Sequence, residues 1–361
     1  MGYKIILVTG GTGGHIYPAL SFAQHIKDRF KEADILFVGN QHRMESTEIP
    51  KHGYAFFGLK TVSITGSIVH RALSYIRLMQ TRHEAGNLIE SFKPDFVVGF
   101  GGYVCVPVIL EASKRHIPTF IHEQNAIAGK ANRFLSRWVK GIAVSYPNNL
   151  NEFPRSKTWL VGNPRTYSIQ NQTKPHLLGE LGLDPKKKTV LFVMGSLGAE
   201  SIHKTASLVL DLLSEKDIQA IYVTGHKHYE SFIEENDERQ GIKILPYIDQ
   251  LQAMHEVDLM VTRGGATTAA EIMALGVASI IIPSPFVPNN HQYYNAQALL
   301  DHKGCIVIEE KDLSVQTLVE TIDSLFNHPS ELERLKTNAK SLGHPQAAQD
   351  MLNHILETLS E

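Results

Sequence analysis

The feature that most constrains the fold of this chain is a unit that occurs twice: an apolar strand, a glycine-rich loop and the start of a helix. In the first half, the apolar residues 4–9 precede Gly10-Gly11-Thr12-Gly13-Gly14-His15. In the second half, the apolar residues 189–194 precede Gly195-Ser196-Leu197-Gly198, and the glycine pairs of the two loops lie 185 residues apart. Strand-loop-helix units in series build parallel sheets that carry helices on both faces. We therefore expect an α/β protein with two similarly built, doubly wound domains.

The rest of the chain continues this alternation of short apolar runs with helical or irregular spacers. Its 361 residues exceed what one hydrophobic core usually supports. We expect a first domain over residues 1–163, a second over residues 164–340, and a C-terminal helix over residues 341–361 that packs back on the first domain. A polar linker is expected at residues 166–188, a first helix from Pro18 to about residue 31, and further strands at residues 35–38, 96–99, 119–122, 141–144, 220–224, 242–245, 259–262, 279–283 and 305–308.

Charge and composition exclude several classes of protein. The 35 Lys and Arg against 37 Asp and Glu give a formal charge of −2, which argues against a dedicated nucleic-acid binder. Cys105 and Cys305 have no metal or redox spacing, which favours a reducing compartment without a structural disulfide. The first strand starts without a signal-peptide layout, and no apolar run reaches transmembrane length. We expect a cytoplasmic protein.

Two stretches have the pattern of an anion-binding helix start. Residues 261–276 read V-T-R-G-G-A-T-T-A-A-E-I-M-A-L-G, which predicts a strand, a tight glycine turn and a helix whose N–H groups favour a phosphate. Glu271 lies at i+4 from Thr267 and would accept hydrogen bonds from a ribose diol. An ordinary strand-to-helix turn with a solvated Glu271 remains the alternative. The loop at residues 10–15 does not fit G-x-G-x-x-G from any of its glycines, which argues against a nicotinamide cofactor.

Polar and glycine clusters follow several other expected strands. In open parallel sheets, ligands bind outside the carboxyl ends of the strands, so clusters of one half converge on one site. These clusters are Gly99-Phe-Gly-Gly-Tyr103 and His122-Glu-Gln-Asn125 in the first half, and Pro246-Tyr-Ile-Asp249 and Pro288-Asn-Asn-His-Gln-Tyr-Tyr-Asn295 in the second.

Together these motifs resemble the GT-B sugar-nucleotide glycosyltransferases and, more narrowly, the MurG family. The narrower resemblance covers about residues 3–300 in the expected order; it is carried by Gly10-Gly-Thr-Gly-Gly-His15, Gly101-Gly102-Tyr103, His122-Glu-Gln-Asn125, Gly162-Asn-Pro164 and Asn290-His-Gln-x-x-Asn-Ala296. It implies a GT-B fold with two Rossmann-like domains facing across a cleft. It also implies inverting transfer of N-acetylglucosamine from UDP-N-acetylglucosamine to the C4 hydroxyl of the muramoyl sugar of lipid I. The product would be lipid II, a precursor of peptidoglycan.

The resemblance assigns the donor chiefly to the second domain. It places helix N–H groups on the UDP diphosphate, Glu271 on the ribose, and the backbone at Ile248 on uracil. It places His291, Gln292 and Asn295 on the sugar hydroxyls, a task that suits Asn and Gln because each offers a donor and an acceptor. A solvated-loop role is the alternative for each single residue. The full set expected to bind UDP-N-acetylglucosamine is Thr12, Gly13, Gly14, His15, Asn125, Arg165, Ser196, Ile248, Arg263, Gly265, Ala266, Thr267, Glu271, His291, Gln292 and Asn295.

The resemblance assigns the acceptor and the base to the first domain. The lipid diphosphate would lie on the helix start at Gly11, Thr12, Gly13 and Gly14, beside Gly101, Gly102 and Tyr103.

The sequence contains no D-x-D pair, so we expect no metal and no other cofactor, with Arg263 or Arg165 assisting the leaving group. His15 is the first candidate for the base and Glu123 the second. As alternatives, His15 would only organise the glycine loop and Glu123 would be a structural acceptor. Arg165 directly follows Pro164, where many members of the family insert a residue, which weakens its assignment.

Residues 61–82 give the clearest pattern for a membrane surface. Apolar residues at helical spacing are flanked there by Arg71, Arg77 and Arg82, which predicts peripheral attachment to anionic lipids on the cytoplasmic face of the membrane. A core-facing helix with solvated arginines is the alternative. Partner proteins of cell-wall synthesis are also expected. Competing functions are a diacylglycerol glucosyltransferase, a UDP-N-acetylglucosamine 2-epimerase, and a nucleotide-binding or membrane-scaffold protein without activity.

Overall fold

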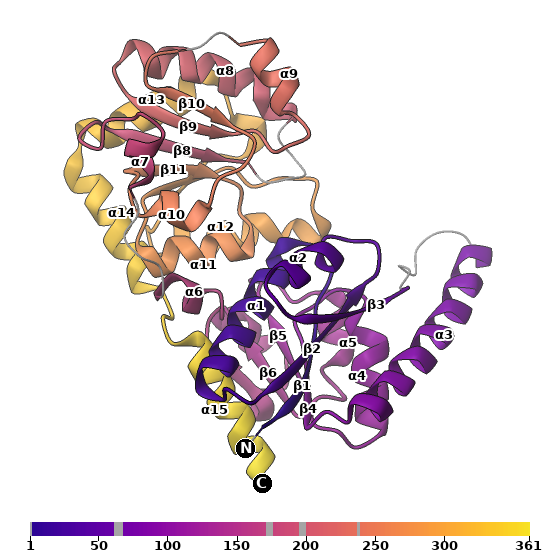
Figure 1. Ribbon diagram of the computed structural model, residues 1–361. Coiled ribbons are helices and arrows are strands. Elements are labelled where there is room, and N and C mark those ends of the chain that lie inside the picture. The colour runs from indigo at the N-terminus through magenta and orange to yellow at the C-terminus, as the bar shows by residue number, and fades with distance from the viewer. Residues whose placement is uncertain (1, 61–67, 171–175, 195–199, 237–238) are drawn as a thin grey trace. The chain divides into compact units, whose positions relative to one another are not determined.

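The chain folds into two compact units. The structure is a computed structural model that describes residues 2–60, 68–170, 176–194, 200–236 and 239–361, and of residues 68–78, 170, 200 and 201 the backbone alone (Figure 1). The first unit contains Met1–Ser168 and His344–Glu361, and the second contains Ile169–Gly343. The boundaries expected at residues 163 and 340 lie a few residues before the observed ones, which follow Ser168 and Gly343. The last segment of the chain thus belongs to the first unit.

The first unit contains a parallel sheet of seven strands in the order β3-β2-β1-β4-β5-β6-β7. The order reverses between β1 and β4, so the loops that follow these two strands flank the topological switch point. The strands are β1 (Lys4–Val8), β2 (Asp34–Asn40), β3 (Ala55–Leu59), β4 (Phe96–Gly99), β5 (Thr119–Glu123), β6 (Gly141–Val144) and β7 (Thr158–Leu160).

Helices cover both faces of this sheet. Ile5 and Leu7 pack on one face with residues of α1 and α15, whereas Ile6 and Val8 pack on the other face with residues of α3, α4 and α5 (Figure 1). Successive strand residues point to opposite faces, so strands buried on both faces are continuously apolar. The helices are α1 (Gly13–Arg29), α2 (Glu45–Lys51), α3 (Ile68–Phe92), α4 (Cys105–Lys114), α5 (Lys130–Leu135) and α15 (Ala347–Ser360), with short 3₁₀ helices at Pro147–Asn151 and Arg155–Lys157.

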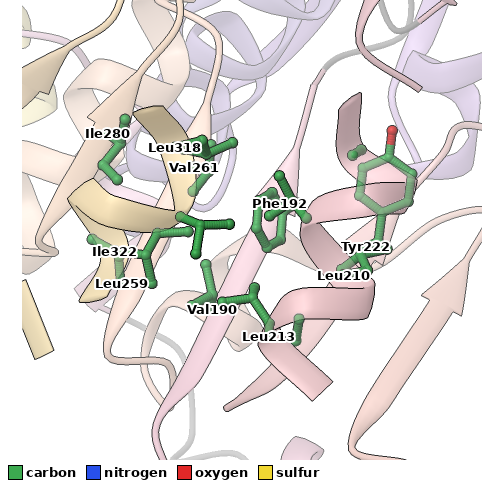
Figure 2. Packing of buried hydrophobic residues seen from close by; sticks show 14 of the residues in the cluster. Val190, Phe192, Leu210, Leu213, Tyr222, Leu259, Val261, Ile280, Leu318 and Ile322 are labelled. Carbon is green, nitrogen blue, oxygen red and sulfur yellow. The ribbon is translucent and has the colours of Figure 1, made fainter. Parts of the chain in front are cut away.

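The second unit repeats this plan with six parallel strands in the order β10-β9-β8-β11-β12-β13. Its largest apolar cluster joins Val190, Phe192 and Tyr222 of the sheet to Leu210 of α8 and Ile322 of α13 (Figure 2). The strands are β8 (Thr189–Val193), β9 (Gln219–Val223), β10 (Ile242–Leu245), β11 (Leu259–Thr262), β12 (Ser279–Ile281) and β13 (Ile306–Val307). The helices are α6 (Thr166–Gln170), which begins in the first unit, α7 (Leu177–Glu180), α8 (Glu200–Glu215), α9 (Tyr229–Glu234), α10 (Gln250–Met254), α11 (Ala266–Leu275), α12 (His291–Leu300), α13 (Val315–Asn327) and α14 (Pro329–Ser341), with 3₁₀ helices at Pro288–Asn290 and Glu310–Asp312.

The structure corrects three expectations about the elements. Helix α1 begins at Gly13 rather than at Pro18, so Pro18 is an interior residue of the helix, where it removes one backbone hydrogen bond without ending the helix. The sequence pattern did not predict β3 and β7, which are partly exposed strands at the two edges of the sheet and lack a long apolar run. The expected linker contains α6 and α7.

The expected membrane segment is described only in part. Residues 61–67 and the side chains of residues 68–78, with Arg71 and Arg77 among them, lie outside the described residues. Met79 is 47% exposed, but Arg82 pairs with Glu111 of α4 at 2.6 Å and is therefore not a solvated rim residue as expected. Within the described ranges, every helix is too short or too polar to traverse a bilayer.

Candidate functional site

The candidate site of the first unit is the loop between β1 and α1. The imidazole Nδ1 of His15 lies 2.8 Å from the carbonyl oxygen of Gly10. A carbonyl only accepts, so Nδ1 carries the proton, and Nε2 is the basic nitrogen of the neutral ring. The N–H of Gly11 donates to the carboxylate of Glu45 at 3.2 Å, so this amide is directed at a side chain rather than at a ligand as expected. Thr12 is the N-cap and Gly13 the first residue of α1, and the N–H of His15 donates to the carbonyl oxygen of Thr12 at 3.0 Å.

Gly101 and Gly102 follow β4 and bring its loop against the first one. Both have the positive φ angles (105° and 87°) that favour glycine. A Cβ on Gly101 would lie 2.9 Å from Nε2 of His15, and one on Gly102 would lie 2.7 Å from the carbonyl oxygen of Gly10. The two loops expected from the sequence are thus in contact at the switch point. Tyr103, the next residue, is 50% exposed.

His122 belongs to the interior of the first unit. Its ring is fully buried, and Nε2 donates to the carbonyl oxygen of Gly162 at 2.9 Å. The pKa of His122 is lowered to about 4, chiefly by burial; the Gly162 carbonyl opposes this shift and the neighbouring His15 adds to it. His122 is therefore neutral at physiological pH and anchors the end of β5 to Gly162.

Glu123 is a structural acceptor, which corrects its candidacy as a base. Its side chain is buried, and Oε1 accepts from the backbone N–H and the Nδ2 of Asn125, at 3.1 and 3.2 Å. Oε2 accepts from the N–H of Gly129 at 2.9 Å and from Nδ2 of Asn132 at 2.8 Å. Four donors use the acceptor capacity of the carboxylate, so it organises the loop that contains Asn125.

Arg165 lies close to the start of α1. Its guanidinium stacks over the ring of Tyr17 at 5.0 Å, and a Cβ on Gly13 would lie 3.0 Å from the same ring. The backbone N–H of Arg165 donates to Asn163 Oδ1 at 3.0 Å. The structure thus brings a cation to the helix start that was expected to bind a diphosphate.

The candidate site of the second unit is the turn between β11 and α11, at the switch point between β8 and β11. Gly265 is the N-cap of α11 and has no side chain to cap the helix, which leaves the helix start accessible to an anion. Thr267 and Thr268 lie in its first turn and are partly buried. Helix α11 ends at Leu275, and Gly276 closes it in the left-handed conformation. The expected strand, turn and helix are confirmed.

Glu271 is held by a residue that the motif does not contain. Gln250, the first residue of α10, donates from Nε2 to Oε2 of Glu271 at 2.5 Å and to Oγ1 of Thr268 at 3.3 Å. Asp249 caps α10 through the N–H of Gln252, and the side chain of Ile248 is buried just before it. The N-cap pattern at Asp249 was the sequence signal that would have placed Gln250 at a helix start.

Arg263 has a different position from the expected one. Its side chain is 6% exposed, and Nη1 pairs with Glu310 Oε2 at 2.7 Å and donates to the carbonyl oxygen of Ile282 at 3.1 Å. The guanidinium thus ties the β11 loop to the segment after β12 and to the 3₁₀ helix at Glu310–Asp312.

Helix α12 supports the same loop. Asn295 is fully buried and donates to the carbonyl oxygen of Gly264 at 3.0 Å, so it holds the loop rather than a sugar hydroxyl as expected. The side-chain Oε1 of Gln292 accepts from the N–H of Ser284 at 2.9 Å. The backbone carbonyl oxygen of Gln292 packs so close to Gly264 that a Cβ there would overlap it. The Nδ1 of His291 donates to the carbonyl oxygen of Pro288 at 2.8 Å. Gln292 and His291 are partly exposed and remain candidates for the sugar.

Two expectations concern residues or ligands that the structure does not test. Ser196 lies outside the described residues. Among the residues that are described, no three His, Cys, Asp or Glu side chains are grouped so as to hold a metal ion, and the absence of a metal remains a prediction.

Comparison with known proteins identifies the family. The N-terminal domain of glycosyltransferase family 28 matches residues 5–144, and its C-terminal domain matches residues 189–351. A UDP-N-acetylglucosamine-N-acetylmuramyl-(pentapeptide) pyrophosphoryl-undecaprenol N-acetylglucosamine transferase of Halalkalibacterium halodurans is 41% identical, over 96% of this chain and 97% of that protein. A transferase of the same name from Lactiplantibacillus plantarum is 40% identical, over 99% of both chains.

A solved structure agrees with these relatives. The crystal structure of Acinetobacter baumannii MurG superposes with a TM-score of 0.75 at 25% identity, over 98% of this chain and 99% of that one. The two Rossmann-like units therefore form a GT-B fold. The chain belongs to glycosyltransferase family 28 and, within it, to the MurG family of N-acetylglucosamine transferases.

Proposed function

We propose that this enzyme transfers N-acetylglucosamine from UDP-N-acetylglucosamine to the C4 hydroxyl of the muramoyl sugar of lipid I and so forms lipid II. The observation that carries the proposal is that each unit has a helix start with glycines at its topological switch point, one of them beside His15. The membership of the chain in the MurG family supports the donor and the acceptor.

In the proposed assignment, the second unit binds the donor. The N–H groups at the start of α11 donate hydrogen bonds to the diphosphate, with the hydroxyls of Thr267 and Thr268 beside them. Glu271 accepts hydrogen bonds from the ribose hydroxyls, and Gln250 fixes the rotamer of the Glu271 carboxylate. The positive end of the helix dipole stabilises the charge that develops on the departing UDP.

The first unit binds the acceptor and supplies the base. The diphosphate of lipid I occupies the start of α1 at Gly13 and Gly14, with the guanidinium of Arg165 nearby. His15 Nε2 removes the proton of the C4 hydroxyl as that oxygen attacks the anomeric carbon. The bond from the anomeric carbon to the diphosphate oxygen breaks, its electron pair leaves with UDP, and the configuration inverts. No metal is needed in this scheme, and undiminished transfer in excess EDTA would support that part of it.

We also propose that the first unit attaches peripherally to anionic lipids. Lys130, Arg133, Phe134, Arg137 and Trp138 recur at helical spacing in and after α5, and all five are exposed. The rings of Phe134 and Trp138 are 46% and 39% exposed and contact each other with centroids 4.7 Å apart. Arg133 pairs with Glu152, so Lys130 and Arg137 are the cations beside the two exposed aromatic rings, and the patch has the composition of a membrane-interface anchor. The patch lies on the same sheet face as α3, which carries the exposed Met79.

Incubation with radiolabelled UDP-N-acetylglucosamine and a lipid I analogue tests the function. Labelled lipid product supports the proposal. Free N-acetylmannosamine would instead indicate an epimerase, labelled glycolipid from diacylglycerol alone would indicate a diacylglycerol glucosyltransferase, and binding of the donor without turnover would indicate a sensor.

A further inference from the structure

Glu45 is a fully buried carboxylate directly beneath the glycine loop of the first unit. It is the first residue of α2, and its two oxygens accept from two different segments of backbone. Oε1 accepts from the N–H of Asn40 at 2.9 Å, and Oε2 accepts from the N–H of Gly11 at 3.2 Å. The side chain therefore ties the loop after β1 to the end of β2.

Gly39 of β2 and Gly10 of the loop after β1 make room for this side chain. A Cβ on Gly39 would lie 2.6 Å from Cγ of Glu45, and a Cβ on Gly10 would lie 2.7 Å from Oε1. Real Cβ atoms do not approach so closely, so the carboxylate occupies a space that larger residues at these two positions would fill.

The burial of this charge is costly unless its hydrogen bonds are made. In the part of the chain that the structure describes, no cationic side chain pairs with Glu45. An apolar side chain would avoid the cost of burying a charge, but it would leave the amides of Gly11 and Asn40 without this acceptor. The distinctive effect of a carboxylate here is thus to fix the backbone of the loop.

That backbone holds His15. The carbonyl oxygen of Gly10 belongs to the peptide group whose N–H, on Gly11, is bound by Glu45, and it accepts from Nδ1 of His15 at 2.8 Å. One rigid, planar peptide group thus joins the carboxylate on its N–H side to the imidazole on its carbonyl side. Rotation of this peptide would move the Nδ1 partner and with it the direction of Nε2.

We propose that Glu45 is the positioning residue of the base: it orients the Gly10–Gly11 peptide and thereby sets the tautomer and direction of His15. The inference rests on the proposed role of His15 as the base. It assigns to Glu45 no contact with either substrate.

The decisive variant is Glu45→Gln, which keeps the size of the side chain but replaces one acceptor oxygen by an NH₂ group. A donor would then face the N–H of Gly11 or of Asn40, and the peptide would rotate or lose its acceptor. We expect kcat to fall by about 10- to 100-fold, because an error of about 1 Å in a catalytic group has an effect of that order. The KM for UDP-N-acetylglucosamine should stay within about twofold, since the donor is assigned to the second unit.

A double-mutant cycle with His15→Ala separates positioning of the base from a structural role. If Glu45 acts through His15, Glu45→Gln should lower kcat further by less than about twofold in the His15→Ala background. A full, multiplicative loss in that background would overturn the proposal, as would a kcat within about twofold of the parent in folded Glu45→Gln. If the parent itself makes no lipid product, the proposed function fails instead.

Two further variants complete the design. Glu45→Asp keeps the charge but is shorter by one methylene, so it reaches one amide at most, and its kcat should fall by less than that of Glu45→Gln. This variant provides the test if Glu45→Gln folds poorly. Glu256→Gln is the matched control, because Glu256 also accepts from two backbone amides, of Leu177 at 2.8 Å and of Leu178 at 3.1 Å, in the second unit. It should leave kcat unchanged, whereas a loss equal to that of Glu45→Gln would overturn the proposal.

Discussion

Gln250 and Glu271 form one side-chain pair across two helices, with Nε2 of Gln250 at 2.5 Å from Oε2 of Glu271. Gln250 lies before the glycine motif in the sequence and outside it, yet it orients the carboxylate that the motif supplies. An amide donor is suited to this task because it orients the carboxylate without neutralising it.

We therefore expect Gln250→Ala to weaken donor binding. The Glu271 carboxylate would lose the donor that fixes its rotamer, and the Kd for UDP should rise about tenfold, which corresponds to about 1.4 kcal/mol. Titration calorimetry with UDP measures this without an acceptor. Gln252→Ala is the control in the same helix, because Gln252 donates to Asp249 through its backbone N–H, which the substitution keeps. Equal affinity of the Gln250→Ala variant and the parent would refute the pairing as a determinant of binding.

His15→Ala should abolish most of the transfer. General-base catalysis contributes about 10²- to 10⁴-fold, so kcat should fall by that factor while the protein stays folded. Product formation from labelled donor and a lipid I analogue measures the loss. His52→Ala, an exposed histidine at the end of α2 in the same unit, should retain parental kcat. A near-normal kcat for folded His15→Ala would remove His15 as the base.

Glu123→Gln should act on stability. The new NH₂ group would replace one carboxylate oxygen and would then face two N–H groups that have lost their acceptor. We therefore expect the free energy of unfolding to fall by about 1–3 kcal/mol. Urea unfolding monitored by circular dichroism measures it, with the exposed Glu84→Gln as the control. Parental stability together with a kcat lowered about 100-fold would restore Glu123 as a candidate base.

The buried His122 should make the protein sensitive to acid. Its pKa is about 4 in the folded state, against about 6.5 in the unfolded chain, so the unfolded state binds the extra proton first as the pH falls. Stability is therefore lost from about pH 6.5 down to about pH 4, by an amount on the order of 3 kcal/mol. Urea unfolding at pH 7 and pH 4.5 should show a smaller difference for His122→Gln than for the parent. Identical differences would contradict this assignment.

The exposed aromatic pair of the first unit should govern attachment to lipid. A Phe134→Ala/Trp138→Ala variant loses the apolar area available for insertion, and its partitioning onto anionic liposomes should fall by at least about tenfold. Flotation with and without anionic lipid measures it. Leu208→Ala/Ile233→Ala is the control, since these residues of the second unit are 55% and 41% exposed. Equal flotation of both double variants would contradict attachment through α5.

The sequence by itself determined the fold class and the family. Glycine loops after apolar strands allow few architectures, because parallel strands buried on both faces must be apolar throughout and their ligands lie at the carboxyl ends. The motif at residues 261–276 accordingly folded as the expected strand, turn and helix. The edge strands β3 and β7 are partly exposed and lack a continuous apolar run, so the apolar pattern of the sequence does not reveal them.

Only the tertiary structure decided which polar side chains hold the backbone and which are presented to a ligand. Glu123, Arg263 and Asn295 have residue types suited to chemistry, but each is buried against partners that lie far away in the sequence or on a returning loop. Glu45 and Gln250 lie outside the motifs and nevertheless contact them. The reason is physical: hydrogen bonds act over about 3 Å in space, and a motif records only neighbours along the chain.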